Sequence, residues 1–172
     1  MTDKIVIALA QLNPTVGKIG ANFEKLREMR KKAAEEGADL ILTSELYTCG
    51  YPPEDLVRKP QFISSLRSAV EAFASETSDG GPAVLLGTPW VESDRLHNSL
   101  VLIEGGAITT ARHKYDLPNY GVFDEKRVFD PGPMPGPISF KDVRIGVPIC
   151  EDIWTPEVVE CITETGGEII LV

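Results

Sequence analysis

The chain has 172 residues, of which 42% are hydrophobic and 25% are charged, proportions that suit one globular core and exclude a disordered chain. Its formal charge of −9 argues against a nucleic-acid or anionic-membrane partner, and no apolar run approaches the roughly 20 residues of a membrane helix. Three cysteines without zinc-like spacing, and an N-terminus without a signal-peptide core, indicate a reducing compartment, which we expect to be the cytoplasm.

The first part of the chain alternates predicted strands and helices. Continuous apolar runs over 4–12 and 38–42 predict two buried strands. Between them, Asn22 is expected to cap an amphipathic helix that ends at Gly37. Glu45 follows the second strand almost directly, and the end of a central strand is where open α/β sheets carry their chemistry.

The middle of the chain begins with a loop over 46–60 that is rich in proline and glycine. A second amphipathic helix is predicted over 62–73 and a third buried strand over 83–88. Residues 99–112 are typical of a hairpin with a two-glycine turn. Lys114 lies just beyond this hairpin and so, like Glu45, follows the end of a predicted strand.

The segment 115–137 is long, irregular and rich in proline, and such loops inside a compact domain usually have a function. A strand over 143–149 then leads to Cys150, and Thr155 and Pro156 are expected to begin a helix. The cysteine therefore lies on a sharp strand-to-helix turn, a suitable place for a nucleophile. The alternative is that it only fills the end of a strand, because free cysteines are among the most buried residues.

The chain ends inside an apolar strand predicted over 168–172, so we expect it to be part of a longer domain. The alternation of strands and helices predicts βαβ units and layered sheets covered by helices. If part of this layered structure is missing, an apolar sheet face should be exposed, and the chain should be oligomeric or poorly soluble.

Glu45, Lys114 and Cys150 are the three groups suited to covalent catalysis. A thiol with a pKa of about 8.5 is mostly protonated at neutral pH, so a nucleophilic cysteine needs a base or a nearby cation. The glutamate and the lysine would supply one of each, although each taken singly could be a solvated surface charge. His97 and His113 are interpreted as structural.

The sequence around these groups resembles a known family. The matching segments are Glu45 to Tyr47, Gly50 to Leu56, Lys114 to Tyr120, Val122 to Glu125 and Cys150 to Trp154. They are similar to the nitrilase, or carbon–nitrogen hydrolase, superfamily, whose members use a glutamate, a lysine and a cysteine. Within it, they are most similar to the glutaminase domains of glutamine-dependent NAD synthetases, and the resemblance covers the whole chain.

The resemblance implies an α/β fold of the αββα sandwich type, with residues 1–172 as the N-terminal part of the glutaminase domain. It also implies that Glu45 is the general base, Cys150 the nucleophile and Lys114 an oxyanion donor. Glu125 looks like the additional acidic residue that orients the lysine.

The same resemblance implies that Tyr120, Glu151 and Trp154 line a site for L-glutamine, with the carboxylate facing the α-ammonium group. Each has a simpler alternative. Tyr120 could be a loop aromatic that covers the core, Trp154 could plug the core, and Glu151 could be a charge favoured at a helix N-terminus.

The resemblance further implies that ammonia from glutamine feeds the ATP-dependent amidation of deamido-NAD in a synthetase domain that this chain lacks. No metal or cofactor is implied for the chain itself, since ATP and magnesium would bind to that domain. We also expect a homo-oligomer. Two interpretations stay open: another amidase of the superfamily, which would share the three reactive residues but not the glutamine site, and a catalytically inactive fragment.

Overall fold

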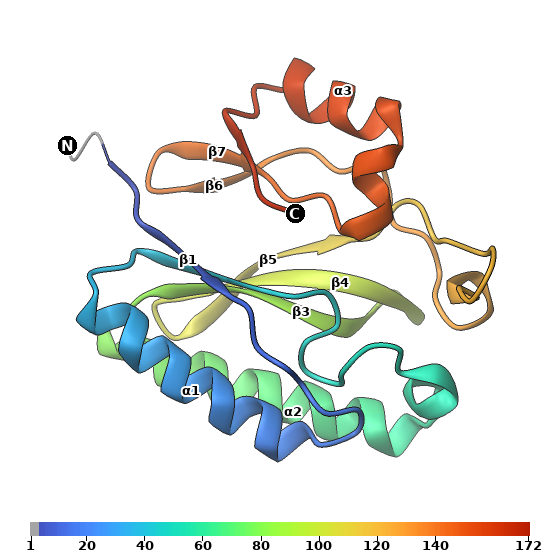
Figure 1. The fold of residues 1–172 in the computed structure, drawn as a ribbon, viewed down its shortest axis with the longest axis horizontal. Coiled ribbons are helices and arrows are strands. Elements are labelled where there is room, and N and C mark those ends of the chain that lie inside the picture. The colour runs from blue at the N-terminus through green and yellow to red at the C-terminus, as the bar shows by residue number, and fades with distance from the viewer. Residues whose placement is uncertain (1–3) are drawn as a thin grey trace.

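The computed structural model describes residues 4–172 and consists of four layers in the order helix, sheet, sheet, helix (Figure 1). The first layer contains α1 (Ile19–Glu35) and α2 (Pro60–Glu76), and the last contains α3 (Pro156–Glu164). This arrangement confirms the predicted αββα fold class. Within the described residues, no helix has both the length and the apolar character needed to cross a membrane.

The inner layers are a five-stranded and a three-stranded sheet, each with its strands in sequence order. The larger sheet contains β1 (Ile7–Ala10), β2 (Leu40–Thr43), β3 (Ala83–Glu92), β4 (Arg95–Glu104) and β5 (Ala107–His113). The smaller contains β6 (Ile138–Phe140), β7 (Val143–Gly146) and β8 (Ile169–Ile170). Strands connected through helices pair in parallel, namely β1 to β3 and β7 with β8, whereas β3 to β5 form an antiparallel meander.

Two tight hairpins, β3–β4 and β6–β7, are absent from the sequence prediction. Their turns are Ser93-Asp94 and Lys141-Asp142, and all four residues have φ between 47° and 65°. Two-residue turns of this kind match the twist of the flanking strands but usually contain glycine, which favours positive φ. Neither turn contains one, so the usual hairpin signal is missing. Because the Ser93-Asp94 turn is not predicted, the predicted strand stops at residue 88, whereas β3 continues to Glu92.

The two predicted helix caps make other contacts, although α3 begins at Pro156 as predicted. Asn22 is not an N-cap, because α1 begins three residues earlier. Its buried side chain accepts a bond from the Thr15 N–H (2.8 Å) and donates to the carbonyl groups of Thr15 (3.0 Å) and Thr48 (3.2 Å). Thr155 does precede α3, but its hydroxyl donates to Asp116 Oδ2 (2.7 Å) and makes no capping bond. Both residues join loops that are distant in sequence.

Two hydrophobic cores cover both faces of the five-stranded sheet. One lies between the sheet and α1 and α2 and includes Phe23, Leu66 and Phe73, and the other lies between the two sheets. The predicted exposed sheet face is therefore not found as a whole. The exposed large apolar side chains on this sheet are isolated: Leu9, on the edge strand β1, is 59% exposed, and Val91, near the end of β3, is 41% exposed.

A buried pair of histidines packs between β4 and β5. The rings of His97 and His113 are stacked, with centroids 4.2 Å apart. His113 Nδ1 lies 2.7 Å from the Ser99 hydroxyl, and Nε2 lies 3.0 Å from Glu92 Oε2, an arrangement that suits a neutral ring protonated at Nε2. Burial lowers the pKa of His113; the bond to Glu92 opposes this effect, and the charge of His97 adds to it.

We expect the free energy of unfolding to fall under mild acid. Because the pKa of His113 is lower in the folded than in the unfolded chain, the unfolded chain binds more protons once the pH drops below about 6.5. The contribution is complete above that pH and is lost as the pH falls. Urea unfolding at a series of pH values should show a flatter dependence for His113→Gln. Equal pH dependence in the two proteins would contradict this role.

Candidate active site

The three reactive residues lie beyond the C-terminal ends of three strands: Glu45 follows β2, Lys114 follows β5 and Cys150 follows β7. The loop that carries the glutamate passes close to the neighbouring strand β3, where Gly87 makes room for it. A Cβ atom at this glycine would lie 2.2 Å from the carbonyl oxygen of Ser44. The Gly87 N–H also donates to the Thr43 hydroxyl (2.9 Å), which ties the end of β2 to β3.

The centre of the site is an ammonium group between two carboxylates. Lys114 Nζ donates to Glu45 Oε1 (2.7 Å) and to both carboxylate oxygens of Glu125 (3.0 Å each). The lysine side chain is 0% exposed, so its charge depends on these partners. Burial alone would lower the pKa of Lys114, but the charges and hydrogen bonds of Glu45 and Glu125 raise it above the ordinary value. The lysine is therefore a fixed cation at neutral pH.

Two further residues complete this network and were missed by the sequence analysis as site residues. Asn98, on β4, donates from Nδ2 to Glu45 Oε1 (2.6 Å) and to Glu125 Oε2 (3.3 Å). The Tyr51 hydroxyl donates to Glu125 Oε1 (3.1 Å). Tyr51 belongs to the matching segments, so it could have been suspected. The position of Asn98 in the sequence gives no sign of its contact with the two carboxylates, because this contact arises only when the antiparallel meander folds.

Cys150 begins a 3₁₀ helix, η4 (Cys150–Trp154), in a strained conformation with φ 47°. Positive φ is uncommon for residues other than glycine and concentrates at functional sites. The residue is exposed, yet its surroundings desolvate the sulfur. Burial of the thiol and the negative charge of Glu45 raise the pKa of Cys150 to about 11, while Lys114 acts in the opposite direction. The resting sulfur is therefore a protonated thiol that needs a base.

Asp152 joins the two halves of the site. Its Oδ1 accepts bonds from the N–H groups of Tyr115 (3.0 Å) and Asp116 (2.8 Å), and its Oδ2 accepts from the Ile149 N–H (3.0 Å). These donors flank the lysine on one side and the Cys150 turn on the other. The carboxylate is 1% exposed, and burial raises its pKa although the three N–H groups oppose this.

The residues expected to bind glutamine lie next to Cys150, since Glu151 and Trp154 belong to η4 and Tyr120 contacts Glu151. The Tyr120 hydroxyl donates to both carboxylate oxygens of Glu151 (3.0 Å each). Tyr120 is 58% exposed and Trp154 is 78% exposed, so neither covers nor plugs the core. Those two simpler alternatives are wrong. The structure brings Tyr120 and Glu151 together, whereas it gives Trp154 no side-chain hydrogen bond within residues 4–172.

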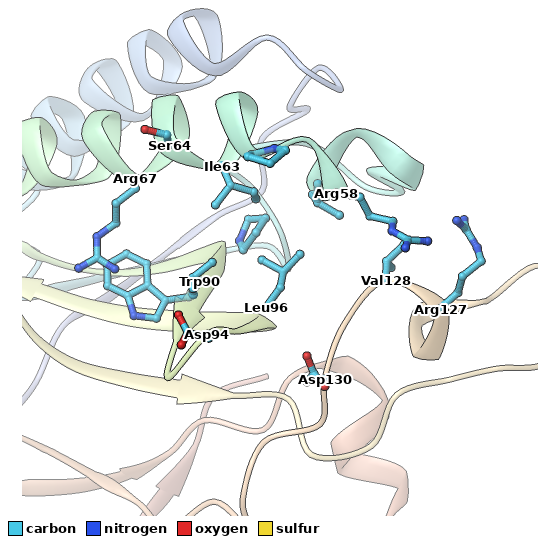
Figure 2. Close-up of a pocket in the computed structure, with 14 residues that line it drawn as sticks. Arg58, Ile63, Ser64, Arg67, Trp90, Asp94, Leu96, Arg127, Val128 and Asp130 are labelled. Atoms are coloured by element: carbon cyan, nitrogen blue, oxygen red, sulfur yellow. The ribbon is translucent and has the colours of Figure 1, made fainter.

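A cavity of about 610 Å³ lies away from these groups (Figure 2). It is bounded by the start of α2, the end of β3, the start of β4 and the loop near Arg127. In it the Arg67 guanidinium stacks over the Trp90 ring at 3.6 Å. Neither Glu45, Lys114 nor Cys150 lines it. The residues that can carry out chemistry therefore lie outside this cavity.

Comparison with known proteins agrees with the geometry. The chain is 40% identical over 172 residues to the glutamine-dependent NAD(+) synthetase of Rhodobacter capsulatus, covering all of this chain and 31% of that protein. It is 46% identical over 158 residues to the corresponding Synechocystis protein, covering 88% of this chain and 28% of that protein. The chain thus spans about a third of the length of these relatives.

Solved structures agree as well. A glutamine-dependent NAD+ synthetase from Acinetobacter baumannii superimposes with a TM-score of 0.90 at 35% identity, covering 96% of this chain and 31% of the other. An amidase from Nesterenkonia superimposes with a TM-score of 0.83 at 27% identity, covering 98% and 66%, and one of its structures shows acrylamide added at the active-site cysteine. The family model for carbon–nitrogen hydrolases matches residues 6–172, and the chain therefore belongs to the carbon–nitrogen hydrolase family.

Proposed function

We propose that this chain is the N-terminal part of the glutaminase domain of a glutamine-dependent NAD synthetase, and that it hydrolyses the side-chain amide of glutamine. One observation carries the proposal: the buried ammonium of Lys114 is held between two carboxylates beside the thiol of Cys150. A base, a cation and a nucleophile in one place are what cysteine-dependent amide hydrolysis requires. The similarity of the whole chain to such synthetases supports glutamine as the substrate.

In the first step the sulfur of Cys150 attacks the amide carbon of glutamine while Glu45 takes the thiol proton. The transfer must accompany the attack, because a thiol with a pKa of about 11 is rarely ionised near neutral pH. The carbonyl π electrons move to oxygen, which becomes the oxyanion of a tetrahedral intermediate. The Lys114 ammonium and the Glu151 backbone N–H stabilise this oxyanion, each by about 3 kcal/mol.

In the second step the carbon–nitrogen bond breaks, and the proton held by Glu45 passes to the leaving nitrogen. Ammonia departs and a thioester to Cys150 remains. A water molecule then gives a proton to Glu45 and attacks the thioester carbon, and collapse of this second intermediate releases glutamate. The proton returns to the sulfur, so the enzyme recovers its resting state.

Recognition of glutamine is assigned to Tyr120, Glu151 and Trp154. We expect Tyr120→Phe to raise the KM for glutamine by about fivefold and to change kcat by less than about twofold, because the hydroxyl orients the Glu151 carboxylate that pairs with the α-ammonium group. Steady-state ammonia release measures both constants. Phe123→Leu, which alters the ring that packs against Tyr120 but no polar group, is the control. An unchanged KM would remove Tyr120 from the glutamine site.

The rest of the proposal concerns the full-length protein. The ammonia would be consumed by the amidation of deamido-NAD in a separate synthetase domain, and ATP and magnesium would bind there. The assembled enzyme would be a homo-oligomer in the cytoplasm.

A second candidate is an amidase with another substrate, which the likeness to the Nesterenkonia amidase favours. The substrates of the two functions differ in the groups near the amide, because glutamine carries an α-ammonium group and a simple amide does not. The test is ammonia release by the full-length protein from L-glutamine, L-asparagine and propionamide at equal concentrations. Preference for glutamine by at least about tenfold supports the glutaminase, since a paired α-ammonium group contributes this much to discrimination. Equal or faster hydrolysis of propionamide would favour the amidase.

A further inference from the structure

Asn98 contacts three residues of the candidate active site at once. Its amide nitrogen donates to Glu45 Oε1 (2.6 Å) and Glu125 Oε2 (3.3 Å), and its backbone oxygen accepts from the Lys114 N–H (2.8 Å). The residue is 0% exposed and lies on β4, between two paired strands of the five-stranded sheet. Its backbone is therefore held by hydrogen-bonded strands on both sides.

The orientation of this amide follows from charge. If the amide were turned around, its oxygen would face two carboxylate oxygens, so the nitrogen must point toward them. The other end is left without a partner: Asn98 Oδ1 is buried and accepts no hydrogen bond within residues 4–172. An unsatisfied buried acceptor destabilises the folded state. A side chain that served packing alone would not carry this cost.

The contacts also distinguish the two oxygens of Glu45. Oε1 accepts from both the Lys114 ammonium (2.7 Å) and the Asn98 amide (2.6 Å), and neither bond involves Oε2. An oxygen that already accepts two strong hydrogen bonds is a poor proton acceptor. Oε2 is then the oxygen that can receive the proton from Cys150.

The charge balance explains why an amide stands at this position. The buried carboxylate of Glu125 and the half-buried carboxylate of Glu45 share one ammonium, which leaves one negative charge that the cation does not compensate. A neutral donor stabilises both carboxylates without adding charge, whereas an acid of the same shape would add a third anion.

We propose that Asn98 is a positioning residue that fixes the rotation of the Glu45 carboxylate, so that Oε1 is occupied and Oε2 alone serves as the base toward Cys150. This inference rests on the proposed amide hydrolysis for its kinetic consequences but not for its geometry. Asn98 acts through Glu45 and does not contact the substrate.

The kinetic test compares Asn98→Ala with Tyr51→Phe in the full-length protein. The first removes both donors from the carboxylate pair, and the second removes a hydrogen bond from Glu125 alone. We expect Asn98→Ala to lower kcat for ammonia release from glutamine by about tenfold to a hundredfold, with KM within about threefold, since a hydrogen bond to a charged group is worth about this much. Tyr51→Phe should lower kcat by a clearly smaller factor, since it leaves both hydrogen bonds to Glu45 Oε1 in place. Equal losses in both would assign the effect to Glu125 and overturn the proposal.

A second variant, Asn98→Asp, separates positioning from packing because it keeps the shape. At high pH the introduced carboxylate cannot donate, whereas its protonated form can, so the ratio of variant to wild-type kcat should rise as the pH is lowered from about 8 to about 6. A ratio that does not change with pH in a folded protein would mean that the role is only structural. Thermal unfolding and the reactivity of the buried Cys49 report on folding.

A readout without glutamine keeps the inference separable from the proposed function. Alkylation of Cys150 by iodoacetamide near neutral pH needs the same proton transfer, so we expect it to slow in Asn98→Ala by about the factor seen in kcat. Mass spectrometry identifies the modified cysteine. If the wild-type protein does not hydrolyse glutamine, the proposed function fails while slower alkylation still supports the inference. Unchanged alkylation of Cys150 in a folded variant overturns it.

Discussion

Replacing Cys150 by alanine should abolish glutamine-supported NAD synthesis by the full-length protein while synthesis from free ammonia continues. The proposed acyl intermediate needs this thiol, because Cys49 is buried in the core and Cys161 lies on α3. Loss of the nucleophile should lower ammonia release from glutamine by at least about four orders of magnitude. Free ammonia bypasses the glutaminase site, so the second activity should be unaffected.

The measurement is NAD formation with glutamine or ammonium chloride as the nitrogen source, in parallel. Cys161→Ala is the matched control, since it removes a partly buried thiol of the same chain and should retain both activities. Glutamine-supported synthesis at the normal rate by the Cys150 variant would return that residue to a structural role. Loss of both activities would indicate that the two reactions are not spatially separate.

Replacing Lys114 by methionine should damage both activity and stability. The side chain keeps its length, but the buried carboxylate of Glu125 and the half-buried one of Glu45 lose their cation. Breaking a buried ion pair typically costs about 3–5 kcal/mol of unfolding free energy. Loss of the oxyanion donor should lower kcat by at least about two orders of magnitude. The loss of stability should be smaller at acidic pH, because burial and the nearby Glu45 raise the pKa of Glu125, and its protonation relieves the repulsion between the two carboxylates.

Urea unfolding at neutral and acidic pH, together with ammonia release, separates the two effects. Lys126→Met is the control, because that lysine is exposed and forms no ion pair within the described part of the chain. A Lys114 variant that is destabilised yet retains its kcat in the folded fraction would show that the lysine is structural. A variant with full stability would mean that the carboxylates are not both charged.

The fold class and the family follow from the sequence, because buried strands followed by amphipathic helices and the segments around Glu45, Lys114 and Cys150 are local signals. The hairpins at Ser93-Asp94 and Lys141-Asp142 escape prediction because the backbone adopts positive φ there without glycine. The ends of strands are also difficult to predict from an apolar run alone. The run over 143–149, for example, leaves the sheet after Gly146.

Residues that act through distant contacts are harder to predict. Asn22 looks like a helix cap, but it joins two loops because α1 begins earlier. Asn98 carries no signal at all, since its importance arises only when β4 places it beside two carboxylates. The roles of Glu45, Lys114, Cys150 and the glutamine residues stay predictions, although the structure does bring the charged groups and the thiol together.

The three backbone bonds to the Asp152 carboxylate have a consequence for the entropy of the reaction. Two of them span 37 and 36 residues, from Tyr115 and Asp116, and the third comes from Ile149 in the same turn. The segment after Lys114 and the turn that carries Cys150 are therefore joined before any substrate binds. A preorganised pair of groups avoids the loss of conformational freedom that would otherwise accompany each turnover. Asp152 takes no part in bond making or breaking. It favours the reaction because the groups it joins are ordered once, when the chain folds, and not again in each catalytic cycle.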